Sequence, residues 1–161
     1  MKYACLVMDH DDTAVQYTNE SYLTFGISCF TDSISDRETI KKHYFYDNGI
    51  LNLFLFQPET KLLENMVAIH LYKKYGEDLY YYNKNVEVDF CVPKEGLLVQ
   101  VSYRMLDDTT KNREVGALQK VAKFLKAKKC MIITYDQEET ITLKDLEIDV
   151  EVVPIYKYLL D

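Results

Sequence analysis

Two apolar, strand-like runs separated by a short turn constrain the fold of this chain more than any other feature. Residues 86–92 alternate aliphatic and acidic side chains, as a strand with one buried face does, and residues 97–103 form a second aliphatic run. Between them stands Pro93-Lys94-Glu95-Gly96, which is rich in turn-forming residues. Because so short a connection cannot carry a crossover, we expect the two runs to pair as an antiparallel hairpin.

Helical patterns lie on both sides of this hairpin in the sequence. Apolar residues recur at helical spacing over residues 60–75, with Thr60 as the expected N-cap and Gly76 as the stop. A second helix is expected over residues 109–126, opened by Asp107. The order predicts an α/β domain with a central mixed sheet, built around residues 86–92, 97–103 and 130–133 and flanked by these helices. Shorter elements are expected as strands at 42–46, 79–82, 141–143 and 148–153 and as a helical turn at 155–160, whereas residues 17–25 and 50–56 fit more than one structure.

Length, charge and cysteine content limit the class of protein. A chain of 161 residues forms one ordinary domain with a core, and its formal net charge of -7 gives it no general attraction for a polyanion. The cysteines include no C-x-x-C pair, so we expect reduced thiols rather than a zinc site or a disulfide framework. The N-terminal apolar run is too short for a signal peptide, and no other segment reaches membrane-spanning length. We therefore expect a soluble, cytoplasmic protein with no membrane contact.

Glu64, Asp89 and Gln100 are the candidate ligands of a metal-dependent nuclease site. Glu64 lies on the first expected helix, whereas Asp89 and Gln100 lie on the two strands of the hairpin. Regular alternation places Asp89 on one face with Glu87 and Cys91, and pairing allows Gln100 to face the same side. Carboxylate and amide oxygens suit Mg²⁺, which lowers the pKa of a bound water for attack on a phosphodiester. Magnesium is accordingly the one cofactor that this pattern implies.

Ser102 stands where a nuclease of this kind would carry a catalytic lysine. Such a lysine orients the attacking water and offsets the developing charge, whereas a serine hydroxyl brings no charge. The neutral Gln100 amide also weakens the metal site. Losing one preorganised electrostatic contact costs roughly 3 kcal/mol of barrier, or about a hundredfold in rate. We therefore include Ser102 in the candidate catalytic group as the position where the lysine is missing. We expect nucleic-acid cleavage to be lost or vestigial.

Ordinary structural roles stay open for the same residues. A glutamate near the start of a helix is favoured by the helix dipole alone, and an aspartate on a strand can simply face water. His10, His43 and His70 are isolated and indicate no metal site. No glycine-rich phosphate loop is present. The end of the second helix is basic, which suits either phosphate contact or a solvated face that pairs with the dipole, and its lysines are Lys120, Lys123, Lys126, Lys128 and Lys129.

Several stretches together resemble the uncharacterised domain found at the C-terminus of many bacterial and archaeal AAA-type ATPases, which is itself related to the PD-(D/E)xK nucleases. The stretches that carry the resemblance are YFYDNGI (44–50), LLENMV (62–67), EVDFCV (87–92), QVSY (100–103), REVGAL (113–118) and IIT (132–134). The resemblance implies a restriction-endonuclease-like fold, with ligand roles at Glu64, Asp89 and Gln100 and a departure from the nuclease pattern at Ser102. Residues 17–30 resemble the end of the winged-helix region that precedes this domain in the relatives. The chain is therefore expected to divide into an N-terminal segment, 1–43, and a restriction-endonuclease-like domain, 44–161.

Three functions follow as hypotheses. The first is an accessory module of an AAA ATPase whose degenerate PD-(D/E)xK site contacts nucleic acid or a protein partner without cleavage. The second is a Mg²⁺-dependent DNA nuclease in which another residue, Lys84 or Lys120, fills the position of the missing lysine. The third is a pure protein-interaction domain, which the net charge of -7 favours.

Overall fold

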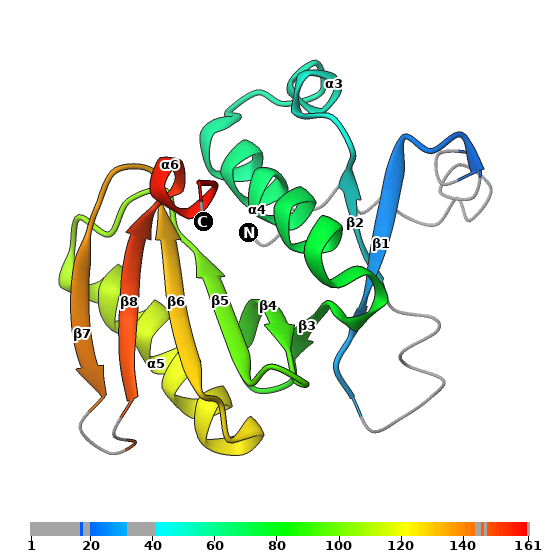
Figure 1. Ribbon diagram of the computed structural model, residues 1–161. Helices are drawn as coiled ribbons and strands as arrows, with labels where there is room; N and C mark the ends of the chain where they lie inside the picture. The colour runs from blue at the N-terminus through cyan, green and yellow to red at the C-terminus, as the bar shows by residue number, and fades with distance from the viewer. Residues whose placement is uncertain (1–16, 18–19, 32–40, 144–145, 147, 161) are drawn as a thin grey trace.

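A computed structural model describes residues 17, 20–31, 41–143, 146 and 148–160. The strands are β1 (Thr24–Cys29), β2 (Lys41–Phe45), β3 (Tyr80–Asn83), β4 (Glu87–Val92), β5 (Leu97–Val101), β6 (Lys129–Thr134), β7 (Glu139–Leu143) and β8 (Ile148–Pro154). The helices are α3 (Asn48–Asn52), α4 (Glu59–Tyr75), α5 (Asp108–Leu125) and α6 (Ile155–Tyr158), with a 3-10 turn η1 (Gly76–Asp78). All the strands belong to one 8-stranded sheet with the order β2-β1-β3-β4-β5-β6-β8-β7 (Figure 1).

The sheet is mixed and flanked by helices, which confirms the predicted α/β class. β4 and β5 form the predicted antiparallel hairpin, and the turn between them is closed by a hydrogen bond from the Gly96 N–H to the Pro93 carbonyl of 3.1 Å. β5, β6 and β8 run parallel, whereas β2 with β1, β3 with β4 and β7 with β8 are antiparallel. β1 also pairs with β3, so strand pairing continues across the boundary expected at residue 44.

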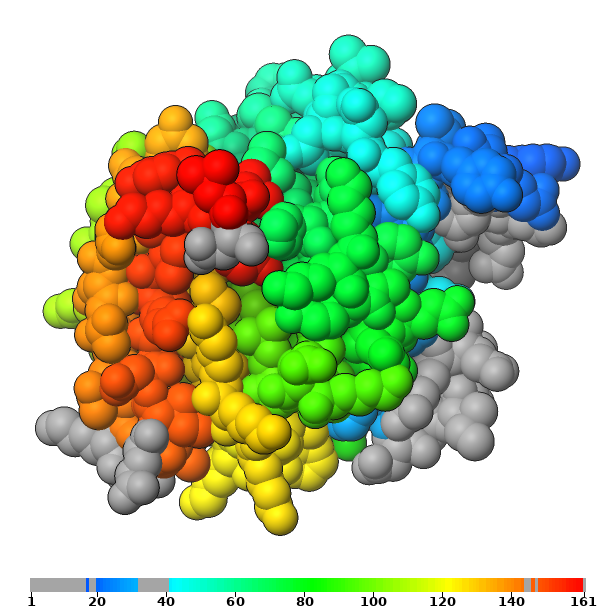
Figure 2. All heavy atoms as spheres, in the orientation of Figure 1, coloured from blue at the N-terminus to red at the C-terminus, as the bar shows by residue number. Residues whose placement is uncertain are grey.

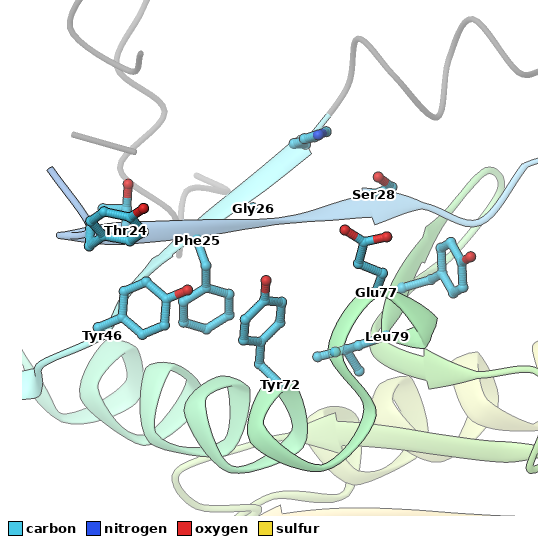
Figure 3. A pocket seen from close by; sticks show the side chains of 12 residues that line it. Thr24, Phe25, Gly26, Ser28, Tyr46, Tyr72, Glu77 and Leu79 are labelled. Carbon is cyan, nitrogen blue, oxygen red and sulfur yellow. The ribbon is translucent and has the colours of Figure 1, made fainter. Parts of the chain in front are cut away.

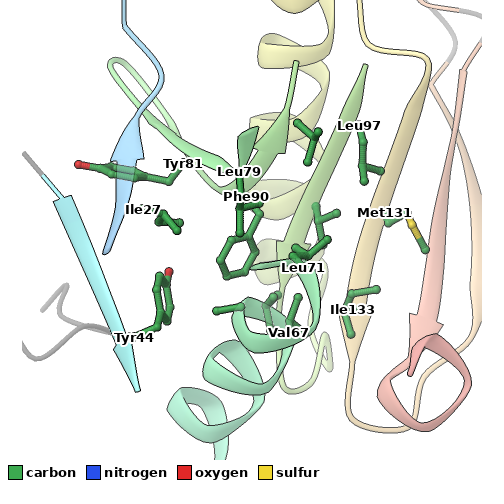
Figure 4. Packing of buried hydrophobic residues seen from close by; sticks show 14 of the residues in the cluster. Ile27, Tyr44, Val67, Leu71, Leu79, Tyr81, Phe90, Leu97, Met131 and Ile133 are labelled. Atoms are coloured by element: carbon green, nitrogen blue, oxygen red, sulfur yellow. The ribbon is translucent and has the colours of Figure 1, made fainter. Parts of the chain in front are cut away.

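The helices α4 and α5 cover opposite faces of the sheet (Figure 1). On the α4 face, Val67 and Leu71 lie in one core cluster with Phe90 of β4 (Figure 4). On the α5 face, Leu118 lies in a second cluster with Ile132 of β6. Full burial of one such side chain contributes about 1.5–3 kcal/mol, so these clusters hold in place the helices that carry Glu64 and other polar groups.

The helix ends follow the sequence signals with one exception. α5 begins after Asp107, whose carboxylate accepts a backbone N–H of the first turn at 2.7 Å, and α4 ends at Gly76, where φ is 54°. The predicted N-cap at Thr60 is wrong, because α4 begins at Glu59, directly after Pro58, without a side-chain cap. Proline lacks an N–H and its restricted φ suits the start of a helix, so the first turn forms before Thr60.

The structure also assigns the segments that the sequence left open. β1 begins at Thr24, and the run at 50–56 contains the end of α3, which opens with the Asp47 carboxylate accepting the Ile50 N–H at 2.9 Å. None of the helices described here is long and apolar enough to cross a membrane. His10 and the N-terminal apolar run lie outside the described residues.

Candidate functional site

A β-bulge in β4 interrupts the alternation of side chains next to Asp89. The pairing of β4 with β3 shifts by one residue along the strand, as it does when one strand carries an extra residue. Val88 and Cys91 consequently both lie in the core cluster of α5, whereas Phe90 lies in that of α4. The predicted sharing of one face by Glu87, Asp89 and Cys91 is therefore wrong for Cys91, because regular alternation does not continue through a bulge.

Asp89 and Gln100 bridge the point where β4 and β5 separate. Direct pairing of the two strands ends at Phe90 and Val99. Beyond it, Gln100 Oε1 accepts the backbone N–H of Asp89 at 3.1 Å, and Asp89 Oδ2 accepts the backbone N–H of Val101 at 2.9 Å. Both side chains are buried. Because an unsatisfied buried donor costs about 1–3 kcal/mol, each residue has a structural role whatever its chemistry.

Lys42 of β2 supplies the cation of this site. Its Nζ lies 2.6 Å from Glu87 Oε1 and 3.8 Å from Asp89 Oδ1, and its side chain is 16% exposed. The ammonium also lies over the ring of Tyr81, 5.1 Å from its centre. Burial alone would lower the pKa of Lys42, but the charges of Asp89, Glu64 and Glu87 raise it above its ordinary value. Lys42 is therefore positively charged at neutral pH.

Glu64 and Asp89 are coupled to each other and to this ammonium. The Tyr44 hydroxyl donates a hydrogen bond of 2.8 Å to Glu64 Oε1, and Glu64 is buried. Burial raises the pKa of Glu64, while the charge of Lys42 and the hydrogen bond from Tyr44 oppose the rise. Burial, followed by the charge of Glu64, raises the pKa of Asp89 to about 8, and Lys42 again acts in the opposite direction. The fold thus brings the two predicted acids, from α4 and β4, into one electrostatic cluster.

Gln100 joins this cluster to α5. Its Nε2 donates to Glu114 Oε2 at 2.7 Å, and the Arg113 Nε donates to Glu114 Oε1 at 3.0 Å. Glu114 is buried, whereas 72% of the Arg113 side chain is exposed. The oxygen of the Gln100 amide therefore accepts a hydrogen bond from β4, and its nitrogen donates one to α5. A chain of hydrogen bonds runs from the surface at Arg113 to the backbone of Asp89.

Ser102 lies beyond the end of β5 and brings no charge to the cluster. It is buried, and its hydroxyl lies 3.5 Å from a neighbouring backbone carbonyl. Of the lysines expected to replace the missing one, Lys84 places its Nζ 5.5 Å from the Phe124 ring centre, and Lys120 is exposed on α5. The lysine beside Asp89 is Lys42, on β2. That strand was not expected to contribute to the site.

Lys42 and Glu114 are among the residues of this cluster that were not predicted from the sequence. Glu114 precedes Ala117 and Leu118 by one turn on the buried stripe of α5, so its place in the apolar pattern was a usable signal for a buried carboxylate. No comparable pattern in the sequence around Lys42 indicates that it lies beside Asp89. Its position depends on the order of β2, β1, β3 and β4 in the sheet, which local sequence patterns do not specify.

Comparison with known proteins adds one relative. The chain is 37% identical over 160 residues to an uncharacterised protein of Methanocaldococcus jannaschii. The match covers 91% of this chain but 35% of that protein, so the chain spans about a third of the relative's length. No family model matches the chain, and no solved structure matches it.

The polar groups around Asp89 do not fit a resident Mg²⁺ ion. Within the described residues, no group of three or more His, Cys, Asp or Glu side chains is placed to hold a metal. Magnesium requires oxygen donors in near-octahedral arrangement, and here the Lys42 ammonium lies against Glu87 and near Asp89 while the Gln100 oxygen accepts a backbone N–H. Chemically, the arrangement is a buried acidic cluster partly neutralised by a fixed ammonium.

Proposed function

We propose that the chain is a non-cleaving accessory module of an AAA-type ATPase, with a restriction-endonuclease-like fold and a degenerate PD-(D/E)xK site. The observation that carries this proposal is the Lys42 ammonium, 2.6 Å from Glu87 and 3.8 Å from Asp89. A fixed positive charge there repels a divalent cation from these acids, and the neutral Gln100 amide adds no negative charge that would hold one. Without a bound metal, the site has no means of lowering the pKa of an attacking water.

The fold assignment has its own support. The buried acids lie where the β4–β5 hairpin opens, and α4 and α5 cover the two faces of the sheet around them. The extra length of the archaeal relative supports a module that works beside further domains. The ATPase itself rests on the resemblance of the sequence.

A protein surface is the partner that the exposed side chains favour. Leu53, Phe54 and Phe56, between α3 and α4, are 79%, 65% and 101% exposed. In the space-filling view this segment lies in the cyan region at the upper edge of the molecule (Figure 2). Neighbouring exposed apolar side chains of this kind mark contacts between proteins, and the net charge of -7 disfavours a polyanion.

Nucleic-acid contact is a second candidate, favoured by one feature. Lys120, Lys123, Lys126 and Lys128 are all exposed on or just after the end of α5. Contact through these lysines would be made with phosphates, and its affinity would fall steeply as salt concentration rises.

A cleavage assay on single-stranded, duplex and branched DNA with Mg²⁺ or Mn²⁺ tests the proposal. We expect no cutting by the wild type or by Asp89→Asn. Cutting by the wild type that is lost in Asp89→Asn and in Lys42→Met, but kept in the exposed control Asp108→Asn, would overturn it. That result would instead establish a metal-dependent nuclease in which Lys42 has taken the position of the catalytic lysine.

A further inference from the structure

A groove of about 510 Å³ lies beside β1, between that strand and the end of α4 (Figure 3). Phe25, Tyr46 and Tyr72 form an aromatic wall, in which the Phe25 ring centre is 4.9 Å from that of Tyr46 and 4.2 Å from that of Tyr72. Glu77 extends its carboxylate toward the Ser28 end of β1 (Figure 3). The residues of the Asp89 cluster do not line this space, so it is a separate feature of the molecule.

The groove follows an edge of β1 that lacks a full partner strand. Along β1, Thr24 to Ser28 pair with β2, but among the described residues only Ser28 and Cys29 pair with β3. The Tyr46 N–H donates to the Leu23 carbonyl at 3.0 Å. This bond shows which residues of β1 form hydrogen-bonded pairs with β2 and which alternate residues point their backbone groups away from it. In that alternation the N–H and C=O of Gly26 point away from β2, toward the groove. The described part of the chain provides no strand partner there.

The outer edge of the same strand pair is protected. Asn65 of α4 accepts the Phe45 N–H at 2.8 Å and donates to the Phe45 carbonyl at 3.0 Å. Asn65 is 2% exposed, so this cover is part of the core. Open strand edges attract further strands, and Asn65 blocks such pairing at Phe45. Gly26 is therefore one position at which the described part of this strand pair can accept another strand.

We propose that this groove binds an extended segment of a partner protein by strand addition to β1. Backbone hydrogen bonds to the N–H and C=O of Gly26 align the segment, and the wall of Phe25, Tyr46 and Tyr72 contacts one of its apolar side chains. Glu77 selects for a lysine or arginine farther along the segment. This inference is independent of whether the Asp89 cluster cuts nucleic acid.

Charge and shape favour this occupant over the alternatives. Backbone donors and acceptors along a strand edge match an extended polypeptide, which repeats the same groups along its length. A second copy of the chain is disfavoured because each copy carries a net charge of -7. A basic or apolar segment of another protein meets no such repulsion.

Selection of short random peptides displayed on phage, with the folded chain as target, tests the proposal. The affinity of each recovered peptide is then measured for the wild type, Gly26→Pro and Gly26→Ala. Proline removes the Gly26 N–H, whereas alanine keeps it and adds a Cβ whose nearest neighbours are the Lys41 side chain at 3.2 Å and the His43 ring at 3.3 Å. We expect Gly26→Ala to bind within about threefold of the wild type and Gly26→Pro to bind about tenfold more weakly or worse. Hydrogen exchange of the Gly26 amide should also slow when peptide binds.

Recovery of no peptide, or of peptides that bind Gly26→Pro as tightly as the wild type, would overturn the proposal. If circular dichroism shows that Gly26→Pro is unfolded, Glu77→Lys provides the second test. Peptides that carry lysine or arginine should then bind about fivefold more weakly, and an unchanged affinity would count against the groove. Self-association of the wild type that is abolished by Gly26→Pro would also contradict it, because a second copy would then occupy the groove.

Discussion

The Lys42 ammonium lies 3.8 Å from the Asp89 carboxylate although two strands, β1 and β3, separate β2 from β4 in the sheet. The same ammonium contacts Glu87 and affects the ionisation of Glu64. Three elements, β2, α4 and β4, therefore depend on one positive charge. The acids of this cluster are therefore paired with an ammonium and are not arranged as the ligands of a metal ion.

Replacing Lys42 by methionine should destabilise the fold. The substitution keeps the length and apolar stem of the side chain but leaves Glu87 without its cation and removes the positive charge beside Asp89. Breaking a buried pair from one side typically costs about 3–5 kcal/mol. Because Lys42 keeps some exposure, we expect a loss near the lower end of that range in urea unfolding. Lys41→Met, at an exposed position on the same strand, should change stability by less than about 0.5 kcal/mol, and equal effects of the two substitutions would contradict the assignment.

Stability should fall as the pH rises through the neutral range. Asp89 has a pKa of about 8 in the folded chain against an ordinary value of 3.8. Between these values the folded chain holds a proton that the unfolded chain has released, so rising pH favours the unfolded state. The slope approaches about 1.4 kcal/mol per pH unit for one proton. The raised pKa of Glu64 acts in the same direction.

Urea unfolding at mildly acidic and at mildly alkaline pH measures this effect. Asp89→Asn is the matched variant, because its amide oxygen can still accept the Val101 N–H while its charge and proton are gone. We expect the variant to depend less on pH than the wild type. Wild-type stability that rises across the same range would show that Asp89 is not the raised carboxyl group.

Gln100→Leu should be destabilising by roughly 2–4 kcal/mol, because it leaves the Asp89 N–H and the Glu114 carboxylate without their buried partner. Adding Glu114→Leu should recover part of this loss, since it removes the buried carboxylate oxygen that Gln100→Leu leaves without a donor. Thermal unfolding of the single and double variants gives the coupling energy. Strictly additive losses would mean that the link between β5 and α5 contributes little.

Local chemistry was sufficient to predict the α/β class and most of the helices and strands. The turn at 93–96 and the flanking aliphatic runs predicted the β4–β5 hairpin, and Asp107 and Gly76 marked helix ends that the structure confirms. The start of α4 was misplaced at Thr60, because Pro58 begins a helix through its restricted φ rather than through a capping side chain. Each success involves residues close together in the sequence.

The candidate site was harder to predict because its geometry depends on long-range pairing. Glu64, Asp89 and Gln100 could be selected from residue type and order. The bulge that places Cys91 on the opposite face from Asp89 could not, because alternation assumes a regular strand. Lys42 could not either, since its approach to Asp89 depends on the strand order of the whole sheet.

Asn65→Ala should release the edge of β2. The substitution removes the two hydrogen bonds to Phe45 and a third to Asn48, at a position that is 2% exposed. We expect a loss of about 2–3 kcal/mol and faster hydrogen exchange at Phe45. Asn52→Ala, at an exposed position on α3, is the control and should leave both quantities nearly unchanged. Unchanged exchange at Phe45 in Asn65→Ala would show that the edge is held by other contacts.

Titration of Mn²⁺ into isotope-labelled protein, followed by paramagnetic broadening of backbone amide signals, tests most directly whether Lys42 closes the site to metal. The ammonium beside Asp89 predicts no selective broadening at Glu64, Asp89 or Val101 as Mn²⁺ is added to the wild type. Selective broadening of these signals at low Mn²⁺ concentration, abolished in Asp89→Asn, would contradict that prediction and show that the acids bind a divalent metal despite the lysine.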